Sequence, residues 1–145
     1  MRLHITIVGV LLATSLPAFA YKTETLQELI ARAEAARPED RPALYVDIAE
    51  RQLKSADEFY TSGKVDDGRT AVKDVVTYSE KAQESAIQSG KRVKNTEIAF
   101  RKMAAKLRDI KRNLNFDDQA PVQAAAERLE NLRTALLSHM FGKGK

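Results

Sequence analysis

A seven-residue pattern of uncharged side chains runs from Val72 to Leu114 and constrains the fold more than any other feature of this 145-residue chain. Such spacing places its members on one face of a helix, as in a coiled coil. It predicts one long helix from about Asp67 to Leu114, about 70 Å long at 1.5 Å per residue. The alternative is a break near Gly90, since glycine costs about 1 kcal/mol within a helix. The pattern comprises Val72, Val75, Ser79, Ala82, Ala86, Ser89, Val93, Thr96, Phe100, Met103, Leu107, Ile110 and Leu114.

The rest of the sequence shows helical spacing as well, without convincing alternation of apolar and polar residues. A first helix should start at Thr25, which can form a capping box with Glu28, and should end near Arg37. A second helix is expected from about residue 42 to 63, and a last one from about residue 121 to 140.

Short turns at 37–41, 62–66 and 115–120 impose an up-down order on these helices. The second helix should therefore pack on the first half of the long helix, and the last helix on its second half. The chain has no cysteine, so packing alone must hold it together. The sequence predicts a single all-α domain over residues 21–141, an antiparallel helical bundle with a long central helix.

The first twenty residues have the form of a bacterial signal peptide. Arg2 precedes an apolar run at 5–16, and small residues flank Phe19 before a cleavage point after Ala20. The run is shorter than the ~20 residues that cross a bilayer. We therefore expect a periplasmic or secreted protein that is not transmembrane after cleavage, with a disordered tail at 142–145.

Catalytic motifs are missing from the sequence after residue 20. Acidic pairs at 39–40, 66–67 and 117–118 each precede a predicted helix, where carboxylates cap free N–H groups and suit the helix dipole. No phosphate-binding glycine loop, nucleophile elbow or metal-spaced histidine pair is present. We expect no enzymatic activity.

His139 is the one candidate for a haem or metal ligand, near the end of the last helix. The segments 123–129 and 133–135 resemble the last helix of soluble periplasmic b-type cytochromes. That resemblance implies a four-helix bundle whose haem is held by a Met on the first helix and a His on the last. The first predicted helix contains no Met, so we expect no cofactor and keep a haem or metal carrier as an alternative.

The hairpin around Gly63 resembles a single tetratricopeptide repeat (TPR), which places small and aromatic residues at fixed offsets. The residues that carry this resemblance are Ala56, Phe59, Tyr60, Gly63, Gly68, Val72 and Val75. A second copy 34 residues away is not visible. The resemblance implies antiparallel packing of the second and third helices rather than a repeat array.

Charge is unevenly distributed along the chain. Residues 39–86 carry seven basic and eleven acidic side chains, whereas residues 91–112 carry nine basic and two acidic ones. The basic segment could contact an anionic surface or form a solvated face. Its nine cations are Lys91, Arg92, Lys94, Arg101, Lys102, Lys106, Arg108, Lys111 and Arg112.

These observations favour a non-catalytic module that binds a protein or an envelope component. Self-association into a homo-oligomer through the long helix is a structural alternative. Export argues against nucleic acid as the partner.

Overall fold

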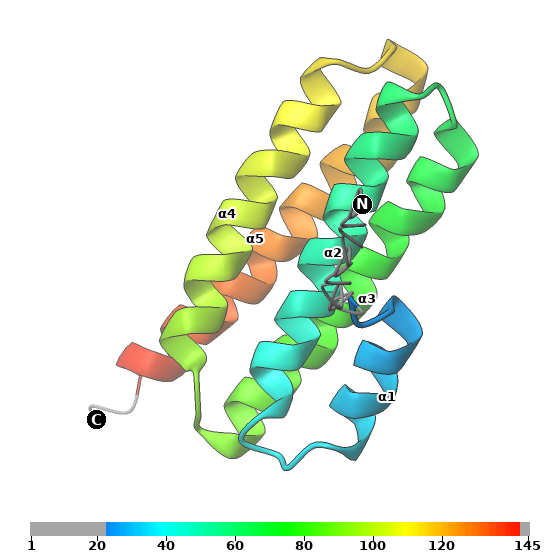
Figure 1. Cartoon of the computed structure of the whole chain (residues 1–145). Coiled ribbons are helices and arrows are strands. Elements are labelled where there is room, and N and C mark those ends of the chain that lie inside the picture. The colour runs from blue at the N-terminus through cyan, green and yellow to red at the C-terminus, as the bar shows by residue number, and fades with distance from the viewer. Residues whose placement is uncertain (1–22, 143–145) are drawn as a thin grey trace, which may run out of the picture.

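The computed structural model describes residues 23–142, which form an all-α helical bundle (Figure 1). The predicted signal peptide and residues 143–145 of the predicted tail lie outside the described residues. Within the described part there are five α-helices, one short 3-10 helix and no strand. They are α1 (Leu26–Ala35), α2 (Arg41–Thr61), α3 (Val65–Ser89), α4 (Val93–Arg112), η1 (Phe116–Asp118) and α5 (Gln119–Phe141). The predicted fold class is confirmed.

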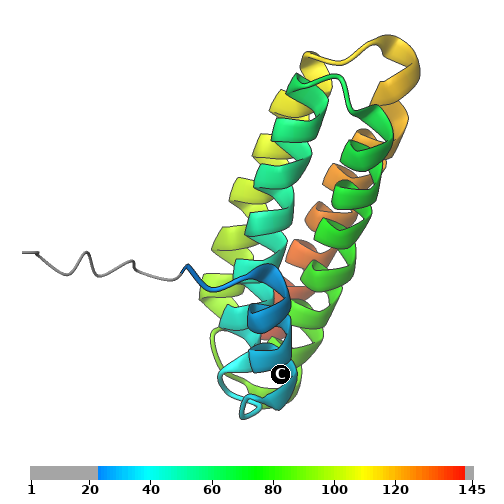
Figure 2. The ribbon, with the colours of Figure 1, turned by 45° about the vertical axis from the view of Figure 1, so that its right-hand side comes forward.

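Helices α2 to α5 form two antiparallel hairpins, α2–α3 and α4–α5, that stack on each other. Figure 2 shows α2 beside α4 in one layer and α3 beside α5 in the other, so neighbours across the stack run parallel. The expected packing of the second helix on the first half of the predicted long helix, and of the last helix on its second half, is confirmed. The short helix α1 packs mainly against α2.

The single long helix expected across residues 67–114 is wrong, because the chain reverses direction after Ser89. Gly90 has φ +65° and Arg92 has φ +59°, both in the left-handed region. Glycine adopts this conformation without steric cost and commonly ends a helix in this way. The Lys91 N–H donates to the Ser89 Oγ across the turn. The reversal lets α4 pack on α2 as well as α5.

The seven-residue pattern nevertheless identifies the buried face of both helices. Ten of its thirteen members are buried, and the other three, at 89, 93 and 114, lie near helix ends. Phe100, Leu107 and Leu129 are fully buried in one common core. The pattern continues through the break because each helix directs the same register of positions into that core.

Two local features define the α2–α3 hairpin, a close contact between the helices and acidic residues at the start of α3. A Cβ atom at Gly68 would lie 2.9 Å from the Tyr60 ring, so only glycine allows this contact. The acidic pair at 66–67 lies in the first turn of α3, where it suits the helix dipole, but α3 has no side-chain capping hydrogen bond, so the capping part of the prediction is wrong here.

The capping predictions for the other helices have mixed outcomes. The Thr25–Glu28 capping box at α1 is confirmed by both of its hydrogen bonds. Asp40 and Asp118 make no capping hydrogen bond, and this part of the prediction is wrong. Both carboxylates instead pair with arginine, Asp40 with Arg37 at 3.0 Å and Asp118 with Arg69 at 2.8 Å.

Candidate functional site

The C-terminal half of α4 uses its cations to hold the bundle together. Lys106 pairs with Asp57 of α2 at 2.7 Å, and Arg108 pairs with Glu130 of α5 at 2.8 Å. Lys111 donates to the side chain of Gln123 at 2.9 Å, and Arg112 pairs with Asp109 on its own helix. Four of the nine predicted surface cations are therefore engaged inside the molecule.

The other five cations form a separate group at the N-terminal end of α4. We call this group the α4 basic face; it consists of Lys91, Arg92, Lys94, Arg101 and Lys102. All five side chains are exposed, and among residues 23–142 none makes a hydrogen bond or an ion pair. Lys94 and Arg101 are seven residues apart, so they project from the same side of the helix about 11 Å apart along its axis.

The acidic residues of α4 do not neutralise this face. Glu97 is buried, and the Arg133 Nε donates to its carboxylate at 2.5 Å. This hydrogen bond raises the pKa of Arg133. Asp109 lies on the other half of the helix and pairs with its neighbour there.

One carboxylate from another helix acts on the face. Glu50 of α2 has its pKa raised by desolvation and by Asp47, and the Lys102 ammonium opposes that rise. Asp40 lines the same groove as Arg92. With these two acids beside five cations, the α4 basic face keeps a net positive charge.

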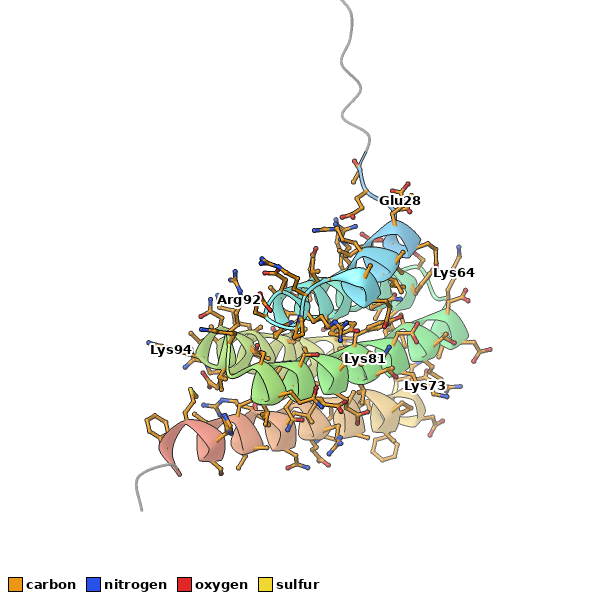
Figure 3. The ribbon with its side chains drawn as sticks, turned by 90° about the horizontal axis from the view of Figure 1, so that it is seen from below. Glu28, Lys64, Lys73, Lys81, Arg92 and Lys94 are labelled. Carbon is orange, nitrogen blue, oxygen red and sulfur yellow. The ribbon has the colours of Figure 1, made fainter. Side chains whose placement is uncertain are left out.

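Arg92 lies at the end of this face beside the α3–α4 turn, as the residue before α4. Its left-handed backbone is uncommon for a residue with a side chain. Its side chain borders a groove of about 360 Å³ that also involves Arg32, Asp40 and Leu44. Figure 3 shows Arg92 and Lys94 close together at this end of the bundle.

The two ends of the bundle carry different sets of charged side chains. The end that holds the α3–α4 turn carries Lys91, Arg92 and Lys94, while the opposite end carries the acidic pairs 66–67 and 117–118 (Figure 1). The first of these ends also holds Glu39 and Asp40, and the second also holds Lys64, Arg69, Lys111 and Arg112.

A second groove, of about 430 Å³, lies between the parallel helices α3 and α5. Val72 and Ala125 form its buried floor, and most of the other lining side chains are exposed. The Arg128–Glu80 ion pair, at 2.8 Å, crosses it. A small-molecule site normally encloses most of its ligand, and this shallow groove does not.

Lys81 attaches α1 to the bundle. Its Nζ lies 2.9 Å from the Glu34 carboxylate and 5.5 and 5.6 Å from the ring centres of Tyr45 and Tyr78 (Figure 3). The hydrogen bond from Lys81 lowers the pKa of Glu34 and raises that of Lys81. This cluster satisfies its own charges, so its role is structural.

His139 lies half-buried in the last turn of α5. Helix α1 has no Met, and in the part of the chain that the structure describes no group of three or more His, Cys, Asp or Glu could hold a metal ion. None of the described helices combines the length and apolar character that a membrane span needs.

Sequence reasoning identified the basic segment but not its division into paired and unpaired halves. That division depends on which acids α2 and α5 place beside α4, which spacing within α4 does not show. The α4 basic face starts at the Gly90 turn, so the possible helix break at Gly90 was the one feature of the sequence that could have indicated this division.

Compared with protein-family models, curated proteins and solved structures, the chain matches none of them. The function must therefore be argued from the charges and exposed surfaces of the molecule.

Proposed function

We propose that this is an exported, non-catalytic helical module that binds an anionic component of the cell envelope through the α4 basic face. The observation that carries the proposal is the set of five exposed cations that make no side-chain hydrogen bond or ion pair among the described residues, beside four that do. Cations that serve only to hold the fold together would be expected to meet acids, as those of the second half of α4 do.

The energetics support binding to a surface rather than to a single small anion. Each Lys or Arg near an anionic membrane contributes about 1 kcal/mol, so five give about 5 kcal/mol, enough for reversible attachment. Exposed charges are screened over about 8 Å at physiological salt, so this attachment should weaken steeply as salt rises.

The TPR-like hairpin remains part of the proposal. Ala56, Tyr60 and Gly68, which carry the resemblance, are buried where α2 meets α3. This arrangement supports a scaffold that presents its outer faces to partners. It does not name a protein partner, and the charge of α4 favours an anionic one.

The test compares two triple variants that remove the same charge. Lys91→Gln, Arg92→Gln and Lys94→Gln together should abolish binding to vesicles that contain phosphatidylglycerol, measured by co-sedimentation in low salt. The control is the triple variant Lys106→Gln, Arg108→Gln and Arg112→Gln. It should retain binding, because those three side chains are engaged in ion pairs. The proposal fails if the protein does not bind in low salt, or if both variants lose binding equally.

A further inference from the structure

Two large apolar side chains are strongly exposed among the described residues, and they lie at opposite ends of the bundle. Phe116 is 87% exposed, in η1 beside Asp117 and Asp118. Phe141 is 80% exposed and is the last residue of α5. Exposed single apolar side chains need no special explanation. The surroundings of Phe141 are what distinguish it.

Phe141 lies at the level of the α3–α4 turn. The Arg133–Glu97 hydrogen bond sets the register of the antiparallel helices α4 and α5. Glu97 is four residues, about 6 Å, from the start of α4, and Arg133 is eight residues, about 12 Å, from Phe141. By helix rise, the end of α5 therefore extends about 6 Å past the start of α4. Figure 1 shows it at the same end of the bundle as the α3–α4 turn.

The free cations at this end are Lys91, Arg92 and Lys94 of the α4 basic face. The acids of the α1–α2 connection lie at the same end (Figure 1), and both pair with Arg37: Glu39 at 3.5 Å and Asp40 at 3.0 Å. An exposed aromatic ring and free cations thus share one end of the molecule. Amphipathic helices that lie in the interface of an anionic bilayer likewise combine Lys and Arg with aromatic side chains.

We propose that the anionic component is the surface of a lipid bilayer and that the bundle docks on it by this end. The Phe141 ring enters the interface between headgroups, while Lys91, Arg92 and Lys94 contact lipid phosphates. The inference rests on the proposed function and adds the bilayer and the orientation. A phosphate-bearing polymer would satisfy the cations but would offer nothing apolar to the ring.

The chain contains no tryptophan, so one introduced indole reports on one position. Phe141→Trp is the probe, and Phe116→Trp is the matched control at the acidic end. With vesicles of phosphatidylglycerol and phosphatidylcholine, emission from position 141 should shift to shorter wavelength and be quenched by brominated lipid chains. Emission from position 116 should change in neither respect.

A truncation pair measures what the ring contributes. Phe141→Ala should weaken vesicle binding about tenfold or more, as loss of a buried aromatic ring predicts. Phe116→Ala should leave binding unchanged. Soluble inorganic polyphosphate serves as the polymer arm, and we expect it to bind with no change in emission from position 141.

Three outcomes would overturn the inference. If the Lys91, Arg92 and Lys94 variant abolishes vesicle binding but the emission from position 141 does not respond, the proposed function stands and the end-on docking is wrong. Equal responses at positions 116 and 141 would show unoriented apolar adsorption. Unchanged vesicle binding in Phe141→Ala would show that the ring does not enter the bilayer.

Discussion

Substitutions of Gly90 and Arg92 test the α3–α4 turn, because a turn and a continuous helix predict changes of opposite sign in the free energy of unfolding. Gly90 adopts φ +65°, and an added Cβ there would meet nothing within 4 Å. Gly90→Ala should therefore destabilise the protein by conformational strain alone, about 1–2 kcal/mol. Arg92 has φ +59°, so Arg92→Gly should relieve the same strain in the folded protein. The greater conformational entropy of glycine in the unfolded chain offsets part of this gain, so the net stabilisation should be up to about 1 kcal/mol.

A helix continuous through residue 90 would reverse both signs. Alanine would then stabilise position 90 by about 1 kcal/mol, and glycine would destabilise position 92 by a similar amount. Urea unfolding followed by circular dichroism resolves the difference, since m values of about 1–3 kcal/mol per M convert 1 kcal/mol into a midpoint change of roughly 0.5 M. A higher midpoint for Gly90→Ala together with a lower one for Arg92→Gly would refute the turn.

Three further predictions concern the core and its ion pairs. Leu107 is fully buried, so Leu107→Ala should lower the free energy of unfolding in urea by about 2–5 kcal/mol. Lys102 is exposed, so Lys102→Ala should lower it by under about 0.5 kcal/mol. Equal urea midpoints for the two variants would mean that the wrong face of α4 was placed inside. Arg133→Ala leaves the buried Glu97 without its donor and should lower stability by about 1–3 kcal/mol, while Arg133→Lys should recover part of that loss in the same assay. Lys81 lowers the pKa of Glu34, so this carboxylate stabilises the fold above its unfolded pKa of about 4.3 and the contribution is lost as pH falls through the lower folded value. The difference in thermal midpoint between the protein and Glu34→Gln should therefore be present at pH 7 and shrink at pH 3; a difference independent of pH would exclude this pair as its source.

Most helix bounds could be predicted from the sequence because their signals are local. Thr25 with Glu28 starts α1, Pro38 follows its end, and Gly63 follows α2. The break at Gly90 could not be decided in this way. A seven-residue pattern is the same for one long helix and for two helices that share a core, and the choice depends on whether Gly90 adopts the left-handed conformation.

The candidate site could be predicted only in part, because it depends on contacts between residues that are far apart in the sequence. Residue type and spacing identify nine cations, but the partner acids Asp57 and Glu130 lie on α2 and α5, 49 and 22 residues away along the chain from Lys106 and Arg108. The exposed Phe141 could not be recognised either, because the sequence does not show that the end of α5 lies beside the start of α4. Tertiary placement, rather than composition, separates the free cations from the structural ones.

Amide ¹H–¹⁵N spectra of the ¹⁵N-labelled protein, recorded with and without bicelles that contain phosphatidylglycerol, show which residues of the bundle contact an anionic bilayer. Amide signals of residues 90–102 and of Phe141 should shift or broaden in low salt and recover in high salt, while those of residues 106–118 should not change. Perturbations centred on residues 106–118, or spread evenly over the bundle, would contradict the assignment of the α4 basic face as the binding surface.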